Sequence, residues 1–291
     1  MDKISRSFVR GGRLISSGSL NGIRAVLRTA LAEARRQGVI HSNPARALRL
    51  PPGAQPRAVV WDEEREKAWQ NTGVRPRVAV WDLHHVGRFL ASVQNDAFFA
   101  LWWLVALRGP RRGEIAGLRW EDVDLAGGEI TIREQVVLVR GVEIVGPPKS
   151  AGGVRTLMLD RFSVELFSAL WREQKRRFGW VDPNGRVFVH ADGRSLRPDW
   201  VTRRFTKLVK DSGLPPVRFH DLRHGAAGVG SAAGMDLKQL QEDLGHSNPW
   251  TTIRTYACVF KQVATAAVQK AADLLLSHVN LKVTLAGAYQ A

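Results

Sequence analysis

Cysteine is almost absent from this chain of 291 residues, which has a single one, Cys258. One cysteine cannot form an internal disulfide, so the fold depends on its core, as expected in a reducing compartment. Long apolar runs are absent as well. The nearest, residues 97–107, is shorter than the roughly eighteen residues that a membrane-spanning helix needs. The N-terminus lacks the apolar stretch of a secretory signal peptide, and we therefore expect a cytoplasmic protein that is not inserted in a membrane.

Acidic residues are scarce relative to basic ones. The chain has 27 Asp and Glu against 43 Lys and Arg, a formal net charge of +16. This excess is far larger than solubility requires and indicates attraction to a polyanion. Nucleic acid is the first candidate, and an anionic membrane surface is the second. The apolar content of 44% is that of a globular protein with a real core, divided into one large domain or two ordinary ones.

The N-terminal part of the chain predicts little structure. Apolar residues within 20–34 recur at helical spacing, with Ser19 as the expected N-cap. A short second element is expected at 43–48, where Pro44 suits a first helical position. Residues 51–80 contain four prolines around a charged middle, which predicts a linker with room for one short helix.

Beyond the linker, the pattern is mainly helical with one alternating region. Helices are expected after Asp82, over 97–107 (buried on every side), after Asp160, from Pro198, from Met235 to Gly245 and over 263–279. Three short antiparallel strands are expected at 128–133, 135–139 and 154–159. The fold class is therefore mainly α with a small antiparallel β-sheet, an α+β protein.

The residues with the clearest chemical meaning lie near the C-terminus. His246 is followed ten residues later by Tyr256, one of only two tyrosines. A phenol is a poor nucleophile at its ordinary pKa, so a tyrosine that attacks phosphorus needs cations around the phosphate and a partner for its proton. The upstream motifs supply the required charges at Arg111, Lys149, His220 and Arg223.

Taken together, these motifs resemble the tyrosine recombinase family, the phage-type integrases, from about Leu20 to about His278. Arg111, three residues before Glu114, corresponds to the first catalytic arginine of that family. Lys149 matches the lysine on a turn of the small sheet. The remaining matches are the H-x-x-R pair His220 and Arg223, His246 in the Leu-Gly-His signature, and the nucleophile Tyr256.

The resemblance implies a site-specific DNA recombinase that cuts and rejoins double-stranded DNA at attachment sites through a 3′-phosphotyrosyl link. Neither a metal ion nor another cofactor is required, because the link conserves the energy of the broken bond. The family further implies a homotetramer on DNA and a location at the bacterial nucleoid. A type IB topoisomerase-like activity is the alternative within the same chemistry.

Several of these residues also have simpler interpretations. Arg111 has basic neighbours and is compatible with ordinary surface charge, as is Lys149 on an exposed turn. His220 and His224 have the H-x-x-x-H spacing of a zinc site, although no third ligand is evident. Cys258 is better explained as a small apolar helix residue than as a nucleophile.

The resemblance also predicts the domain organisation. Residues 1–50 correspond to part of a helical core-binding domain, 51–80 to the linker, 81–279 to a catalytic domain that includes a C-terminal interaction helix, and 280–291 to a tail. The earlier helices of the core-binding domain have no counterpart in the sequence. We therefore expect either a misplaced start codon or a truncated remnant, and a remnant that binds DNA without catalysis is the second alternative function.

Overall fold

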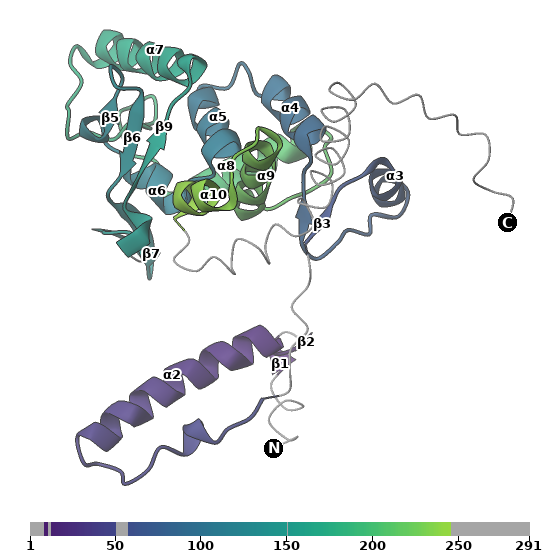
Figure 1. Ribbon diagram of the computed structural model, residues 1–291, viewed down its shortest axis with the longest axis vertical. Coiled ribbons are helices and arrows are strands. Elements are labelled where there is room, and N and C mark those ends of the chain that lie inside the picture. Colours follow the sequence, from purple (N-terminus) through teal and green to yellow (C-terminus); the bar gives the residue numbers. More distant parts are fainter. Residues whose placement is uncertain (1–8, 11–12, 51–57, 150, 246–291) are drawn as a thin grey trace, which may run out of the picture. The chain divides into compact units, whose positions relative to one another are not determined.

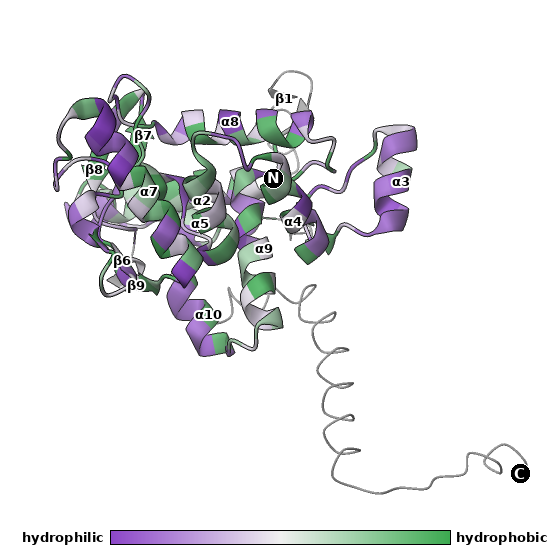
Figure 2. Ribbon diagram, turned by 90° about the horizontal axis from the view of Figure 1, so that it is seen from above, coloured by the Kyte–Doolittle hydropathy of each residue, from purple (hydrophilic) through white to green (hydrophobic). Residues whose placement is uncertain are grey.

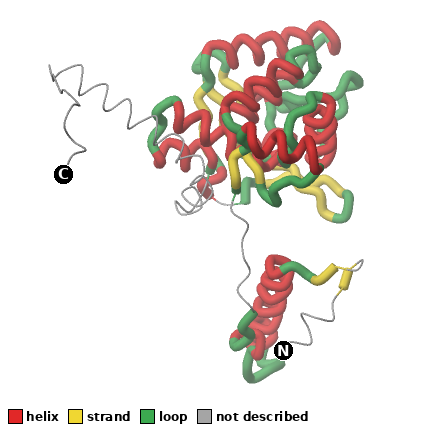
Figure 3. The backbone as a smooth tube through the Cα atoms, turned by 90° about the vertical axis from the view of Figure 1, so that its right-hand side faces the viewer, coloured by secondary structure: helices red, strands yellow, loops and turns green. Residues whose placement is uncertain are grey.

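The computed structural model describes residues 9–10, 13–50, 58–149 and 151–245. The chain divides into two compact units, Met1–Pro56 and Arg57–Ala291, and each is described by itself. Helices are the main regular structure of the described chain, and the strands are short (Figure 3). The expected fold class, mainly α with small antiparallel sheets, is confirmed.

The first unit is built on one helix, α2 (Ser17–Arg36). Its N-cap is Ser16, whose hydroxyl accepts a hydrogen bond from the backbone N–H of Ser19 at 3.1 Å. The predicted N-cap at Ser19 is therefore wrong, because the earlier serine takes that role. The short 3-10 helix η1 (Pro44–Arg46) lies against α2, and Asn43 joins them by donating to the carbonyl of Arg28 at 2.9 Å. A two-stranded ribbon, β1 (Val9–Arg10) with β2 (Arg13–Leu14), precedes α2.

The second unit begins within the segment that the sequence assigned to a linker. Strand β3 (Val59–Val60) pairs in parallel with β4 (Ala79–Val80), and helix α3 (Glu63–Thr72) lies between them in the chain. Trp61 is 1% exposed, belongs to the main core and packs edge-on against Trp69. Residues 58–80 are therefore folded, since Trp61 is buried in the main core, Trp69 packs against it and β3 pairs with β4. The predicted division into core-binding and catalytic domains stays a prediction.

Helix α5 (Phe99–Arg108) forms the centre of the second unit, as the uninterrupted apolar run predicts (Figure 1). Leu101, Trp102, Leu104 and Val105 are all fully buried. Helices α4 (Leu83–Ser92), α7 (Arg161–Phe178) and α9 (Phe219–Ala232) pack against it. In Figure 2 the apolar colour extends along α5 and much of α9, whereas α3 and α10 (Leu237–Leu244) are mainly hydrophilic. The cleft described below lies where α9 meets α6 and the residues that follow α5.

Five short strands lie between α6 (Arg112–Gly117) and α7. One sheet has the order β5 (Val123–Asp124), β6 (Glu129–Ile132), β9 (Arg155–Met158), and all its pairings are antiparallel. The expected strand at 135–139 is β7 (Gln135–Val139), which pairs with β8 (Val142–Gly146) instead of joining that sheet. The sequence analysis missed β8, because its side chains are almost all exposed and show no alternation between apolar and polar residues.

The connections that carry the site residues follow local rules. Asp82 and Asp160 cap α4 and α7, as predicted, and Asp236 caps α10, which therefore begins after the expected Met235. Helix α8 (Pro198–Asp211) begins at its proline, and Gly245 ends α10 with a φ of 58°. Among the described residues, each helix is too short or too polar to cross a lipid bilayer.

Gly113 allows α6 to lie directly on β7. A methyl group on its Cα would come 2.5 Å from the carbonyl oxygen of Val136, which is a severe overlap with backbone. We expect Gly113→Ala to lower the free energy of unfolding by about 1–3 kcal/mol, measured by urea denaturation. Gly87 in α4 is the matched control, because a methyl group there would extend into open space, with no neighbouring segment within 4 Å. Gly87→Ala should leave stability unchanged or raise it by up to about 1 kcal/mol, and equal losses in the two variants would contradict this account.

Candidate functional site

The second unit contains a cleft of about 640 Å³ between α6, β7, α8 and α9. Its basic lining residues are Arg111, Arg112, Arg218, His220 and Arg223. No carboxylate is found among the described residues that line it. A concave surface with several guanidiniums and no acidic side chain concentrates positive potential and is suited to an anionic group.

Arg111 lies at a rigid junction between two helices. Gly109 ends α5 with a φ of 62°, Pro110 follows, and Arg111 is the N-cap of α6. A methyl group on Gly109 would approach the side chains of Arg223 and Leu244, each at 3.1 Å. Glycine at this position therefore permits both the left-handed turn and the close packing of α9 and α10 against it.

Glu114 holds Arg111 in place from the buried side. The backbone N–H of Arg111 donates to Glu114 Oε2 at 2.9 Å, and its Nη1 donates to Oε1 at 2.6 Å. Arg155 Nη2 donates to the same Oε2 at 2.8 Å. Arg111 and Glu114 therefore form an i,i+3 ion pair, and a second guanidinium shares the carboxylate.

The two arginines also determine the ionisation of Glu114, whose side chain is completely buried. Burial by itself raises the pKa of this carboxyl group. The hydrogen bond and charge of Arg155, followed by those of Arg111, outweigh that effect and hold the pKa of Glu114 below its ordinary value of 4.5. The carboxylate is therefore ionised at neutral pH in spite of its burial.

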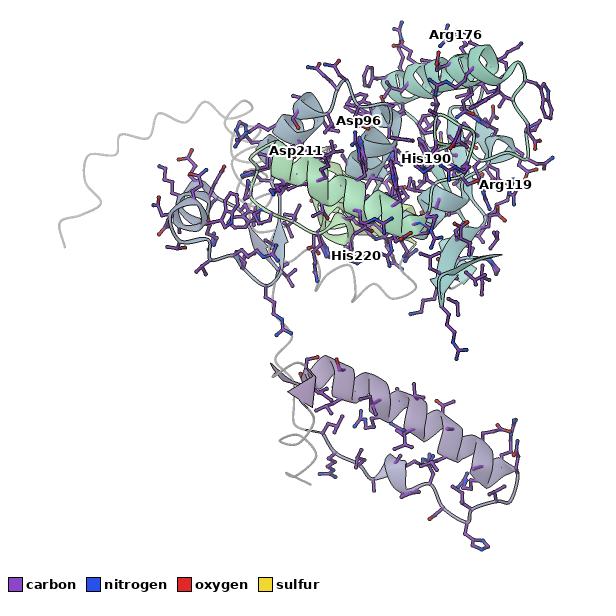
Figure 4. All side chains as sticks on the ribbon, turned by 180° about the vertical axis from the view of Figure 1, so that it is seen from behind. Asp96, Arg119, Arg176, His190, Asp211 and His220 are labelled. Atoms are coloured by element: carbon purple, nitrogen blue, oxygen red, sulfur yellow. The ribbon has the colours of Figure 1, made fainter. Side chains whose placement is uncertain are left out.

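Helix α9 contributes the other two cleft residues that the motifs predicted. Arg223 is buried, and its Nη1 donates to the carbonyl oxygen of Gly109 at 2.7 Å, two residues before Arg111. His220, labelled in Figure 4, lies one turn earlier at the start of the helix. Solvent still reaches this imidazole, yet partial burial and the charges of Arg223, Arg218 and Arg111 lower its pKa. The ring is neutral near pH 7.

Beside this pair, the buried Asp221 accepts two hydrogen bonds from Arg218, at 2.7 and 2.8 Å. Burial lowers the pKa of His224 to about 4. The rings of His220 and His224 are edge to face with centroids 5.8 Å apart. Within the described part of the chain, no group of three or more His, Cys, Asp or Glu side chains is placed to hold a metal ion.

The structure brings together three of the six predicted site residues, Arg111, His220 and Arg223. Lys149 is exposed in the segment between β8 and β9 and is not among the residues that line the cleft. His246 and Tyr256 lie outside the described residues, as does Cys258. The last described residue, Gly245, is tied to the cleft, because its carbonyl oxygen accepts a hydrogen bond from Arg111 Nη2 at 3.1 Å.

The sequence analysis did not identify Arg155. This arginine is the first residue of β9, and its side chain is 6% exposed. The strand alternates between buried and exposed positions, and Arg155 shares the buried face with Leu157. An arginine at an inward-facing position of a short strand is unusual. That pattern could have marked Arg155 in the sequence, but it does not indicate that Glu114 would be its partner.

The ion-pair cluster around Glu114 generates a prediction about stability and pH. We expect Glu114→Gln to lower the free energy of unfolding by about 3 kcal/mol at pH 7, because it leaves Arg155 buried without its charged partner. A carboxyl group with a lowered pKa in the folded state stabilises the protein above its unfolded pKa, and this contribution disappears as the pH falls.

The difference between wild type and Glu114→Gln should therefore be constant above about pH 5 and shrink as the pH falls below 4.5, the ordinary value. Chemical denaturation over pH 3–8 measures both quantities. A difference that does not change with pH would show that the ion pairs contribute nothing through the charge of Glu114.

Comparison with known proteins identifies the family. The Phage integrase family model matches residues 89–262. The chain is 28% identical to the ICEBs1 integrase of Bacillus subtilis over 208 residues, which cover 69% of this chain and 56% of that protein. It is 24% identical to a tyrosine recombinase XerC-like protein of Caldanaerobacter subterraneus, over 90% of this chain and 67% of the relative. The putative prophage phiRv2 integrase of Mycobacterium tuberculosis is 31% identical, over 57% of this chain and 44% of its own length.

Solved structures share the fold. The Tn1549 transposon integrase, in complex with transposon right end DNA, superimposes with a TM-score of 0.63 and 22% identity, over 89% of this chain and 80% of that one. The XerA recombinase gives a TM-score of 0.52 and 22% identity, over 77% of this chain and 70% of that one. Because the family model covers more than half of the sequence, this chain belongs to the phage integrase family of tyrosine recombinases.

Proposed function

We propose that the protein is a site-specific DNA recombinase that cuts and rejoins double-stranded DNA through a 3′-phosphotyrosyl intermediate. One observation carries the proposal: Arg111 and the distant α9 pair, His220 and Arg223, line one cleft without a described carboxylate. The hydrogen bond from Arg111 to the carbonyl of Gly245 supports it further, since Gly245 immediately precedes His246.

In the proposed reaction, the phenolic oxygen of Tyr256 attacks the scissile phosphorus and forms the 3′-phosphotyrosyl bond. Arg111 and Arg223 neutralise the charge of the pentavalent transition state through bidentate hydrogen bonds. His220 and His246 donate hydrogen bonds to the phosphate oxygens, and one of them assists removal of the phenolic proton. Lys149 donates a proton to the departing 5′ oxygen. A 5′ hydroxyl from the partner duplex then attacks the phosphorus of the phosphotyrosyl link, which releases Tyr256 and restores the DNA backbone.

Double-stranded DNA is the proposed partner. The net charge of +16 is suited to a phosphate backbone, and the Tn1549 integrase, which shares the fold, was solved in complex with DNA. The chain spans little more than half of the ICEBs1 integrase and two thirds of the XerC-like relative. A homotetramer on two duplexes, a core-binding role for residues 1–50 and an interaction role for 263–279 are part of the same proposal.

The nucleophile can be tested without knowing the attachment site. The full chain is incubated with a pool of nicked duplexes whose sequence is randomised around the nick, so that a cleaved end diffuses away and the covalent product accumulates. We expect a protein–DNA adduct that survives denaturation and whose DNA reveals the preferred site. Tyr256→Phe should abolish the adduct while DNA affinity changes less than about threefold, because only the nucleophilic oxygen is removed.

Tyr289→Phe is the matched control, since Tyr289 is the only other tyrosine of the chain. It should form the adduct at the wild-type rate. An adduct that persists in Tyr256→Phe, or a wild-type chain that forms none, would overturn the proposal. Sequence-specific binding with a steep salt dependence but no adduct would identify a non-catalytic DNA-binding protein. Relaxation of any supercoiled plasmid would favour a type IB topoisomerase-like activity.

The proposed role of Lys149 as proton donor is tested separately, by changing the leaving group. Lys149→Ala should slow single-turnover cleavage of the recovered duplex by about 10²–10⁴-fold, the usual range for loss of a general acid. Replacing the 5′ bridging oxygen by sulfur creates a leaving group that departs as a thiolate and needs no proton. The variant should then cleave within about tenfold of the wild-type rate on the sulfur substrate. Equal slowing on both substrates would exclude Lys149 as the proton donor.

A further inference from the structure

We infer that Arg155 is the positioning residue that holds the turn bearing Lys149 against the Arg111 side of the cleft. The inference rests on the proposed function, because it concerns how Lys149 is delivered to the leaving oxygen. This role differs from those proposed for Arg111, His220 and Arg223, because Arg155 is buried and is not among the residues that line the cleft. Its effect would pass through the groups that it binds, the carboxylate of Glu114 and two main-chain carbonyls.

The guanidinium of Arg155 joins three segments that are distant in sequence. Its Nη2 donates to Glu114 Oε2 at 2.8 Å, and Glu114 in turn binds Arg111. Its Nε donates to the carbonyl oxygen of Asp243 at 2.6 Å, near the end of α10. Its Nη1 donates to the carbonyl oxygen of Gly153 at 3.0 Å, in the short 3-10 helix η3 (Ala151–Gly153) that follows Lys149. One planar group therefore fixes the relative positions of three parts of the site.

The Lys149 turn is held on both sides of the lysine. A methyl group on Gly153 would lie 2.3 Å from Cβ of Pro148, so the backbone of Gly153 packs directly on the ring of that buried proline. A methyl group on Gly245 would lie 2.8 Å from the carbonyl oxygen of Gly152 and 3.1 Å from Arg155 Nη1. Close contacts between backbone segments of this kind leave little freedom to shift. The backbone is therefore packed at Pro148, before Lys149, and at Gly152 and Gly153, after it, while the Lys149 side chain is exposed to solvent.

The charge balance of the cluster favours an arginine at this position. Glu114 alone would neutralise Arg111, the cation proposed to bind phosphate. With Arg155 on the same carboxylate, two positive charges share one negative charge, and the cluster keeps a net positive charge. A lysine would retain the charge but not the planar arrangement of donors that reaches two main-chain carbonyls and a carboxylate at once. Arg155→Lys therefore separates positioning from charge.

The test compares Arg155→Lys with Arg186→Lys in the full chain. Arg186 is the matched control, because its side chain is 11% exposed and it also bridges a carboxylate, that of Glu134 at 2.6 Å, and a main-chain carbonyl, that of Gly117, but binds neither Glu114 nor the segment that follows Lys149. Both variants are assayed on the recovered duplex for affinity and for single-turnover cleavage, with oxygen or sulfur at the 5′ bridging position. Circular dichroism verifies that each is folded.

For Arg155→Lys we expect affinity within about threefold of wild type and cleavage of the oxygen substrate slowed by about 10²-fold. The sulfur substrate should recover at least about tenfold of that loss, because it no longer needs the proton of Lys149. Arg186→Lys should cleave both substrates within about threefold of wild type. A loss in Arg155→Lys that sulfur does not recover, or a loss equal to that of Arg186→Lys, would overturn the inference.

If Arg155→Lys does not fold, Pro148→Ala decides the question, because it loosens the Lys149 turn, on which Gly153 packs, while Arg155 and its bonds to Glu114 and Asp243 are unchanged. It should slow cleavage of the oxygen substrate by about tenfold, with recovery on the sulfur substrate. An unchanged rate would refute the inference. A wild-type chain that forms no adduct refutes the proposed function, and the role of Arg155 falls with it.

Discussion

The geometry of the cleft depends on one buried carboxylate shared by two guanidiniums. Glu114 is completely buried, yet it stays ionised because Arg111 and Arg155 surround it. Removing either arginine would leave a buried charge without full compensation, which is costly in a protein interior. Because Glu114 needs both arginines, its ion pairs connect α6, which begins after Arg111, to β9, which begins at Arg155. It also explains why Arg111 faces the cleft from a fixed backbone position.

Glycines make this arrangement sterically possible. Gly109 provides the left-handed turn after α5, and its carbonyl accepts the hydrogen bond from Arg223 on α9. Gly245 ends α10, and its carbonyl accepts the hydrogen bond from Arg111. In each case a side chain would collide with a neighbour that belongs to the site. Backbone carbonyls can therefore approach the arginines closely, and the guanidiniums are oriented before any substrate binds.

The cleft and the Lys149 turn combine rigid and adjustable parts. Arg111 and Arg223 are anchored through the backbone and through Glu114, which suits groups that must meet a phosphate in a defined orientation. Lys149 is exposed, and only the backbone around it is packed. A proton donor on a flexible stem can follow a leaving oxygen, provided that its base stays in position. The pKa values of His220 and His224 lie below the ordinary value, so both imidazoles are neutral near pH 7.

Much of this protein is determined by local sequence. The caps at Asp82, Asp160 and Asp236, the stop at Gly245 and the apolar run of α5 follow from neighbouring residues alone, because a helix end and a buried helix are recognised within one or two turns. The motifs also identified Arg111, His220 and Arg223 before any spatial information. Tertiary structure decided the rest. The folding of residues 58–80 depends on where Trp61 finds a core, the exposed strand β8 depends on its partner β7, and the role of Arg155 depends on carbonyls and a carboxylate from three distant segments. The contacts of Trp61 with the core, and of Arg155 with Glu114 and Asp243, join residues far apart in the chain, and the pattern around each residue does not specify which distant group it will meet.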